Sequence, residues 1–341
     1  MTRLTVLLVF GGESSEHDIS IMSARNVYAG MDGEKYDTKL CYIDRNGKWW
    51  LLGSWVEDLT RHGGMQLVVA PGTSGFMTVP GGTIVHPDVI FPALHGKNGE
   101  DGTIQGLAKL LHAPIVGPSL LGAAVTMNKE LTKRVLQQAG IPVVEWRTWY
   151  THTSSPAYSE IREALGETVI IKPANAGSSM GVSKVRSEEE YDAALDVAAQ
   201  YDSIVLIERA IEGIEAQLAL KGKRDPEITD ICEIESVADF HDFEDKYSDS
   251  SPVQFHIPAR LSAEQTERIK KYAKDAYNLT RCEGMARIDF FVTDEYTEYL
   301  NEINSIPGFT NVSVYPKLWR ASGKHYPQLI DELIQDAVKY K

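Results

Sequence analysis

The chain has 341 residues, more than one hydrophobic core usually organises, so two or three domains that share a cleft are expected. Hydrophobic residues make up 43% and charged residues 24%, ordinary globular values that exclude a disordered or collagen-like chain. A net charge of −14 repels nucleic acid and anionic membranes, so small molecules are the expected partners.

The N-terminus and the cysteines bear on location. Residues 4–10 are apolar but too short for the core of a secretory signal with its cleavage site, and they predict a strand. No run approaches the roughly 20 apolar residues that span a bilayer. Cys41, Cys232 and Cys282 are odd in number and widely spaced, which favours neither a disulfide framework nor a zinc site. A cytoplasmic protein outside the membrane is expected.

The first domain is predicted over residues 1–122. An apolar strand at 4–10, a glycine turn and a helix at 14–28 are followed by a strand at 88–94 and a helix at 102–112. This alternation is typical of the α/β class and predicts an open, Rossmann-like parallel sheet.

Two further domains are expected, at 123–213 and 214–341. The second begins with a helix over 127–139, with Met127, Leu131 and Val135 on one face, and continues with strands at 168–172, 182–185 and 204–208. In the third, residues 238–258 lack periodicity and are too long for an ordinary connector, which predicts a mobile loop. Two strands around 287–304 and a helix at 326–340 close the chain.

A metal site is the first chemical candidate. Strand alternation places Arg287 and Asp289 on one face, and Glu302 and Asn304 on one face of the next strand. If the strands form a hairpin with Asp289 opposite Glu302, the Cβ atoms of these two acidic residues lie about 5 Å apart. Such oxygen ligands suit Mg²⁺. The alternative is a half-exposed hairpin with ordinary surface charges, and a shift of register by one residue would separate the faces.

Three glycine-rich segments are candidate ligand sites. Lys172 precedes a Gly/Ser loop through Gly181 whose backbone N–H groups can turn toward an anion, although a purely structural hairpin is the alternative. Lys129 is either a second phosphate contact or a solvated lysine. The loop after residue 94 begins with His95 and includes Asp101, which either serves a ligand or caps the next helix. Glu16 follows Gly11 and Gly12 and either binds a substrate ammonium or favours the helix dipole.

In their order along the chain, these segments resemble the D-alanine:D-alanine ligases of the ATP-grasp superfamily. The resemblance spans nearly the whole sequence and is carried by Gly11 to Ser20, His95 to Gly106, Gly177 to Lys184, Lys246 with Tyr247, and Arg287 to Ser313. It departs at Asn128, where the family commonly has aspartate, and loosely at residues 214–220.

The resemblance implies a two-domain ATP-grasp unit after the first domain and a role for each matching residue. Phosphate contacts are implied for Lys129, Lys172, Ser178, Ser179 and Lys246, contacts to the adenine and ribose for Glu208 and Glu215, and magnesium ligation for Asp289, Glu302 and Asn304. Substrate contacts are implied for Glu16, linked through Ser178 to Tyr247, and for His95, Ser313 and Val314, with an oxyanion site at Arg287 and the Gly308 N–H.

The implied reaction uses ATP and two Mg²⁺ ions, for which Mn²⁺ could substitute, to activate D-alanine as an acyl phosphate that a second D-alanine attacks. The product would serve peptidoglycan synthesis, and a homodimer is usual in the family. D-serine or D-lactate ligases of glycopeptide resistance remain an alternative, although the apolar Val314 favours D-alanine. Another carboxylate–amine ligase and a non-catalytic ATP-binding paralogue also stay open, whereas a dehydrogenase is disfavoured because no GxGxxG motif occurs.

Overall fold

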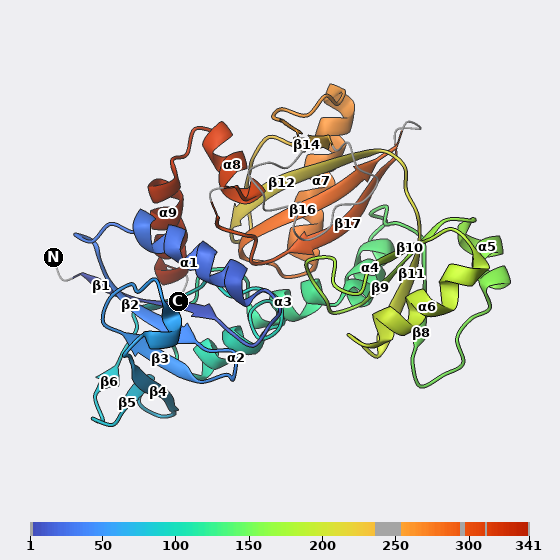
Figure 1. Cartoon of the computed structure of the whole chain (residues 1–341). Coiled ribbons are helices and arrows are strands. Elements are labelled where there is room, and N and C mark those ends of the chain that lie inside the picture. Colours follow the sequence, from blue (N-terminus) through green and yellow to red (C-terminus); the bar gives the residue numbers. More distant parts are fainter. Residues whose placement is uncertain (1–2, 236–253, 294–296, 311, 340–341) are drawn as a thin grey trace.

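The computed structural model describes residues 3–235, 254–293, 297–310 and 312–339, which form three β-sheets with helices packed around them (Figure 1). The sheets follow one another along the chain, the first within residues 4–92, the second within 146–209 and the third within 214–304. None of the helices in the described part of the chain combines the length and apolar character that crossing a bilayer requires.

The first sheet has the order β6-β5-β4-β3-β2-β1-β7. Its strands are β1 (Leu4–Gly11), β2 (Tyr36–Ile43), β3 (Trp49–Leu52), β4 (Met65–Ala70), β5 (Gly75–Val79), β6 (Ile84–Val85) and β7 (Val89–Pro92), with a 3₁₀ turn η1 (Leu59–Arg61) between β3 and β4. Only β2, β1 and β7 are parallel. The expected parallel sheet therefore continues as an antiparallel meander, because short connections such as residues 44–48 join only antiparallel neighbours.

The parallel strands bring two candidate loops together. Helix α1 (His17–Gly30) follows β1, and α2 (Thr103–Leu110) follows the loop after β7. Gly11 ends β1 with φ +91°, and a Cβ there would lie 2.2 Å from the carbonyl oxygen of Ile43, so the turn requires glycine. Because β1 and β7 are adjacent, the loops after them lie at the same carboxyl edge of the sheet.

The second sheet is antiparallel, in the order β10-β9-β11-β8. It comprises β8 (Trp146–Tyr150), β9 (Val169–Pro173), β10 (Ser183–Val185) and β11 (Ile204–Arg209), with α5 (Tyr158–Leu165) and α6 (Glu188–Ala199) packed against it. Val169 and Ile171 of β9 face these helices. Strand alternation therefore directs Lys172 to the opposite face, beside the neighbouring strand's Glu208.

The helix expected over 127–139 is α4 (Lys129–Gln138), and a separate helix, α3 (Leu120–Met127), precedes it. Asn128 is extended between them, and its side-chain oxygen accepts a hydrogen bond from the Leu131 N–H at 2.8 Å. The face of α4 that carries Leu131 is not the buried one, because Leu131 is 41% exposed whereas Lys133 and Leu136 are buried. The break at Asn128 resets which side of the helix meets the protein.

The third sheet contains β12 (Ile214–Gly222), β13 (Glu227–Ile228), β14 (Cys232–Glu235), β15 (Gln254–His256), β16 (Gly284–Val292) and β17 (Glu298–Asn304). Helix α7 (Ala263–Leu279) covers its apolar face. Part of the segment expected to be irregular is thus strand β15, which pairs with β14. Helix α7 was not predicted from the sequence, although Ser262 and Gln265 form a capping box at its start.

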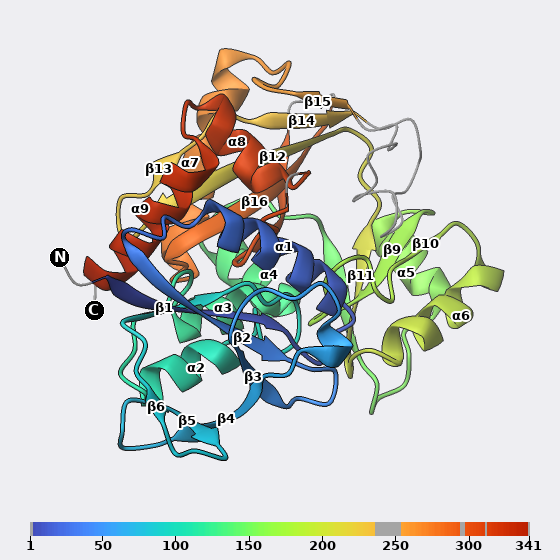
Figure 2. The ribbon, with the colours of Figure 1, turned by 60° about the vertical axis from the view of Figure 1, so that its left-hand side comes forward.

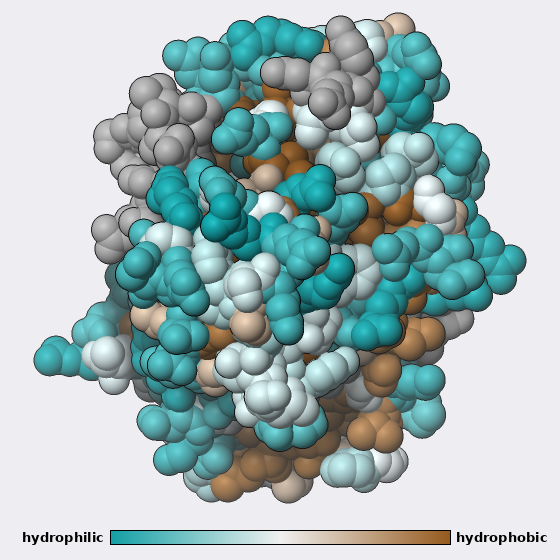
Figure 3. Space-filling model, turned by 90° about the vertical axis from the view of Figure 1, so that its right-hand side faces the viewer, coloured by the Kyte–Doolittle hydropathy of each residue, from teal (hydrophilic) through white to brown (hydrophobic). Residues whose placement is uncertain are grey.

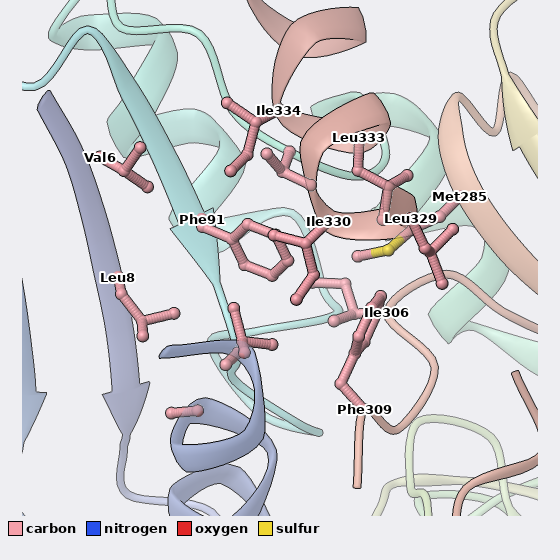
Figure 4. Close-up of a cluster of buried hydrophobic side chains, with 14 of the residues drawn as sticks. Val6, Leu8, Phe91, Met285, Ile306, Phe309, Leu329, Ile330, Leu333 and Ile334 are labelled. Atoms are coloured by element: carbon pink, nitrogen blue, oxygen red, sulfur yellow. The ribbon is translucent and has the colours of Figure 1, made fainter. Parts of the chain in front are cut away.

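The last helices return to the first sheet. Helix α9 (Tyr326–Lys339) lies beside α1, as the views in Figures 1 and 2 both show, and α8 (Val314–Ala321), which was not predicted, precedes it. Ile330 of α9 points toward Phe91 of β7, and Met285 and Ile306 border the same cluster (Figure 4). The segment from β17 to α8 is therefore held against the loops after β1 and β7.

The surface is largely polar where it can be followed. Figure 3 shows the face on the right-hand side of Figure 1, where hydrophilic side chains predominate and hydrophobic ones form smaller patches between them. Three consecutive glutamates, Glu188 to Glu190, open helix α6 in the second-sheet part of the molecule. This acidic turn adds to the excess negative charge of the chain.

Candidate active site

The hairpin of β16 and β17 has the register that the alternation of its residues predicted. Arg287 lies opposite Asn304, and Asp289 lies opposite Glu302. The Asn304 amide donates to Asp289 Oδ2 at 3.1 Å and to Glu302 Oε1 at 3.3 Å. A bulge follows Asp289, so the simple register does not extend to Phe290, but the four polar residues lie before it.

These residues form a site that suits a hard cation. Asp289 is 3% exposed, and burial raises the pKa of its carboxyl group to about 6 even though the Arg287 guanidinium opposes the rise. Arg287 donates to both Asp289 oxygens, at 2.8 and 2.7 Å. Within the described ranges no group of three or more acidic, histidine or cysteine side chains is placed so that it could hold a metal ion by itself. A metal at Asp289, Glu302 and Asn304 would therefore complete its shell with phosphate or water oxygens.

The two candidate phosphate lysines lie near this hairpin. Lys129 Nζ donates to the carbonyl oxygen of Ala176 at 2.5 Å, so it is not the solvated surface lysine of the alternative interpretation. Burial lowers the pKa of Lys129, while Glu302 opposes this effect and Lys172 adds to it. Lys172 is 7% exposed and its Nζ lies 2.8 Å from Glu208 Oε2. Both ammonium groups thus belong to one electrostatic cluster with the metal-site hairpin.

The Gly/Ser loop between β9 and β10 adopts a strained conformation. Ser178 and Ser179 have φ values of +48° and +59°, in a region that residues with a Cβ rarely occupy. Ser178 Oγ donates a short hydrogen bond to Glu16 Oε1. A Cβ at Gly177 would lie 3.2 Å from the other Glu16 oxygen. The loop is therefore held against the first domain rather than serving only as a hairpin turn.

Glu16 is not a helix cap. It occupies the N-cap position of α1, but its side chain makes no capping hydrogen bond and turns to Ser178 instead. Ser14 fixes the turn, because its Oγ donates to the carbonyl oxygen of His95 at 2.8 Å and accepts from the Glu16 N–H. This arrangement directs the Glu16 carboxylate away from α1 and toward the Gly/Ser loop.

His95 links Glu16 to the segment after β17. It is 5% exposed, and burial lowers the pKa of its imidazole, although the Glu16 charge opposes this. His95 Nε2 is 3.0 Å from Ser23 Oγ, and the Phe309 N–H donates to the same oxygen at 3.4 Å. Asp101, in contrast, accepts hydrogen bonds from the N–H groups of Asn98 and Thr103 and serves the turn before α2.

The segment after β17 brings Gly308 and Ser313 together. Ser313 is 8% exposed, and its Oγ accepts from the Thr310 N–H at 3.1 Å. A Cβ at Gly308 would lie 2.7 Å from Ser313 Oγ, so the close approach requires glycine. Val314, the first residue of α8, directly follows.

Glu208 and Glu215, the two predicted contacts to the adenine and ribose of ATP, both interact with other side chains of the protein. Glu208 is 3% exposed and pairs with lysines, and Glu215 Oε1 accepts from the Gln217 amide at 2.9 Å. Glu215 also contributes to the electrostatics of Asp289. Lys246 and Tyr247 lie outside the described residues.

Comparison with protein families identifies the group to which this geometry belongs. The model of the D-ala D-ala ligase N-terminus matches residues 5–118, and that of the D-ala D-ala ligase C-terminus matches residues 135–335. The chain belongs to the D-alanine–D-alanine ligase family. It is 40% identical over 338 residues to the D-alanine–D-alanine ligase of Solibacter usitatus, covering 98% of this chain and 96% of that protein. It is 37% identical over 352 residues to D-alanine–D-alanine ligase A of Escherichia coli K12, covering 99% and 97%.

Solved structures of this ligase family share the fold. The D-alanine–D-alanine ligase of Coxiella burnetii superposes with a TM-score of 0.89 at 33% identity, covering 100% of this chain and 95% of that one. The VanG D-Ala:D-Ser ligase of Enterococcus faecalis superposes with a TM-score of 0.88 at 33% identity, covering 98% and 100%. The α/β architecture with an ATP-grasp unit is therefore confirmed.

Three polar residues of this family member, the partly buried Glu100 and the buried Ser23 and Lys133, join the site without having been predicted. Glu100 accepts from the Gly96 N–H at 2.9 Å, and burial followed by the Glu16 charge raises the pKa of its carboxyl group to about 8. Ser23 bridges His95 and Phe309, and Lys133 pairs with Glu208. Glu100 lies inside a recognised motif, and Lys133 lies one helical turn after Lys129, so both carried a local signal.

Proposed function

We propose that this chain is an ATP-dependent ligase that joins two D-alanine molecules into D-alanyl-D-alanine, through a D-alanyl phosphate, for peptidoglycan precursors. The observation that carries the proposal is the Ser178–Glu16 hydrogen bond. It joins a Gly/Ser loop suited to phosphates to a carboxylate suited to an ammonium, in a chain matched over nearly its whole length by ligases of this name. An amino acid held by Glu16 would lie beside the phosphates.

The nucleotide would bind between the second and third sheets. Lys129, Lys172, Lys246 and the backbone around Ser178 and Ser179 would hold its phosphates, and Glu208 and Glu215 its adenine and ribose. The hairpin residues Asp289, Glu302 and Asn304 would hold two Mg²⁺ ions, with Mn²⁺ as a substitute. The buried Asp289 carboxylate and the half-buried, closely spaced oxygens of the other two fit such ions. Bound Mg²⁺ supplies charge neutralisation at the phosphate oxygens.

The first D-alanine would lie with its ammonium on Glu16 and its carboxylate near His95. Burial disfavours the charged form of His95, so the ring offers a hydrogen bond without a permanent charge. The lysines draw the γ-phosphate toward this carboxylate, whose oxygen attacks phosphorus and displaces ADP. Tyr247 and Lys246 are proposed to cover the acyl phosphate and exclude water.

The second D-alanine would enter beside Ser313 and Val314. Its neutral amine attacks the activated carbonyl carbon, and the Arg287 guanidinium with the Gly308 N–H would stabilise the oxyanion that forms. Arg287 is anchored for this task by its two hydrogen bonds to Asp289. Phosphate then leaves and the peptide bond remains.

The remaining assignments concern organisation. We propose units at 1–122, 123–213 and 214–341, a homodimer in solution and a cytoplasmic location. The three sheets fall within these ranges, which supports the division. The loop predicted over 238–258 lies outside the described residues except for 254–258. Size-exclusion chromatography with light scattering tests the dimer, because a monomer at micromolar concentration would contradict it.

The central test is phosphate release by the purified protein with Mg²⁺ and ATP, with products identified by mass. D-alanine alone is expected to yield the dipeptide and L-alanine to yield none. D-serine and D-lactate are added with D-alanine because of the likeness to the Enterococcus D-Ala:D-Ser ligase. Products only from a mixed pair would reassign the second subsite to D-serine or D-lactate. If no substrate pair leads to phosphate release, another ligase or a non-catalytic paralogue would be favoured.

A further inference from the structure

A second buried lysine lies behind the predicted phosphate site. Lys133, on α4, is 1% exposed and its Nζ lies 3.0 Å from Glu208 Oε1. The same ammonium donates to the carbonyl oxygen of Val144 at 2.9 Å and lies 5.5 Å from the centre of the Trp146 ring. Glu208 therefore has one oxygen on Lys133 and the other on Lys172.

The charges of these three groups are coupled. Burial raises the pKa of the Glu208 carboxyl, but Lys133 and then Lys172 outweigh it and hold the pKa below its ordinary value. Burial lowers the pKa of the Lys133 ammonium to about 8, so at neutral pH it is mostly protonated and the trio carries two positive charges and one negative charge. With Lys133 present, the Lys172 ammonium is in excess over the carboxylate, and that surplus charge can serve an anion.

Stability alone is a weak reason for such an arrangement. Replacing buried ion pairs by apolar side chains of similar volume is often neutral or stabilising, because burying charges has a large desolvation cost. The face of α4 that carries Lys133 also carries Leu136, which is fully buried, so an apolar residue would suit the packing. The charge at Lys133 is better explained by what its partners do.

We propose that Lys133 is a positioning residue for ATP: by neutralising Glu208 it leaves the Lys172 ammonium available to the phosphates. The inference rests on the proposed function, because it assumes that Lys172 and Glu208 face the nucleotide. Without Lys133, Glu208 and Lys172 form a neutral buried pair, and the ammonium has to leave the Glu208 carboxylate to reach a phosphate.

The test compares buried lysines. Lys133→Met is expected to weaken binding of Mg²⁺-ADP, measured by titration calorimetry, at least about tenfold, equivalent to the loss of about one charged hydrogen bond. Lys221→Met is the control, because Lys221 is 4% exposed, pairs with Glu227 and lies 5.7 Å from the Trp319 ring, away from the trio. It is expected to lower the melting temperature and leave ADP affinity unchanged.

Charge balance gives an independent readout. Glu208→Gln removes the competing carboxylate, so Mg²⁺-tripolyphosphate, which lacks the base and ribose, should bind at least as tightly as to the unmodified protein. The double variant Lys133→Met with Glu208→Gln restores the surplus charge and should recover most of the tripolyphosphate affinity that Lys133→Met loses. The Glu208→Gln measurement stands even if Lys133→Met does not fold.

Several results would overturn the inference. These are unchanged ADP affinity in Lys133→Met, weaker tripolyphosphate binding in Glu208→Gln, or no recovery in the double variant. A failed proposed function is distinguishable, because the unmodified protein would then bind no Mg²⁺-ADP and release no phosphate. Binding by the unmodified protein together with an unaffected Lys133→Met variant contradicts only the role of Lys133.

Discussion

Asp289 shows how one residue can be costly for folding and still suited to its task. Its carboxylate is buried beside Glu302, and Arg287 only partly offsets the cost of that burial. A folded protein tolerates such a group when a ligand uses it, and closely spaced buried oxygens are what a divalent cation requires.

Glu302→Gln is expected to reduce turnover by at least about a hundredfold with the fold retained, because it removes one metal-ligating charge without changing the side-chain volume. Phosphate release at increasing Mg²⁺ concentration, with circular dichroism as the folding control, measures this. Normal turnover at the usual Mg²⁺ concentration would refute the metal role of Glu302.

Gly96→Ala tests the position of Glu16. Gly96 has φ +67°, and an added Cβ would lie 2.4 Å from Glu16 Oε2, so the carboxylate has to move. We expect the KM for D-alanine to rise at least about tenfold, in line with the sensitivity of bound substrates to small displacements. Gly33→Ala, where no atom lies within 4 Å of the added Cβ, is the control. Equal KM values in the two variants would argue against Glu16 as the ammonium site.

At the element scale, the junction between α3 and α4 depends on Asn128. Its side chain caps α4, and its main chain breaks the helix so that Lys129 begins a new first turn. Asn128→Ala is expected to lower the free energy of unfolding by about 0.5–2 kcal/mol, whereas Asn128→Asp keeps the cap and favours the helix dipole. Urea unfolding measures both, and equal losses in the two variants would exclude capping as the cause.

An ion pair between Lys221 and Glu332 connects helix α9 to strand β12. Burial raises the pKa of the Glu332 carboxyl, but hydrogen bonds from Lys221 and Lys324 outweigh it and lower the pKa from its ordinary value of 4.5 to about 2. A lowered folded-state pKa stabilises the protein above the unfolded value, and this stability is lost as the pH falls from about 4.5 to 2.

Glu332→Gln should therefore lower the free energy of unfolding at pH 7 by about 1–3 kcal/mol, a range typical of losing one partner in a half-buried charged network. The difference in the free energy of unfolding between the variant and the unmodified protein should become smaller below pH 4.5. Urea unfolding across that range measures it, and a difference independent of pH would show that packing rather than charge is responsible.

At the scale of the whole molecule, the cores do not follow chain order. One cluster unites Val6 and Phe91 of the first sheet with Ile330 and Ile334 of α9 (Figure 4). The buried residues of another all lie within 161–207, in the second sheet and its helices. The first sheet, α9 and part of the third sheet thus share a core and the second sheet has its own, whereas Leu136, Ile141 and Val143 pack with the third sheet.

Ile330→Ala is expected to cost about 2–5 kcal/mol and to increase hydrogen exchange in both β1 and β12, because one cavity weakens a shared core. Leu195→Ala, in the core of the second sheet, should increase exchange in β9 and β11 alone. Exchange followed by mass spectrometry distinguishes the two patterns. A uniform increase in either variant would contradict this division of the cores.

Local patterns along the sequence predicted much of this protein. The Asp289–Glu302 register followed from alternation within one hairpin, and the loops after β1 and β7 followed from glycine turns at strand ends, because each depends on residues close together in the chain. The order of the motifs likewise predicted the family.

Only the tertiary structure decided how those pieces meet. Ser178 and Glu16 form a hydrogen bond although they are 162 positions apart in the chain. Lys133 contacts Glu208 from a different face of α4 than the one that carries Leu131. Helix α9 completes a hydrophobic core that also contains residues of β1. The antiparallel meander gave the strands of the first sheet other neighbours than a fully parallel sheet would have. The break at Asn128 determined which face of α4 is buried. Contacts between distant elements depend on the packing of the whole chain. The hydrophobic periodicity of a segment indicates which of its faces is buried, but not which other element covers that face.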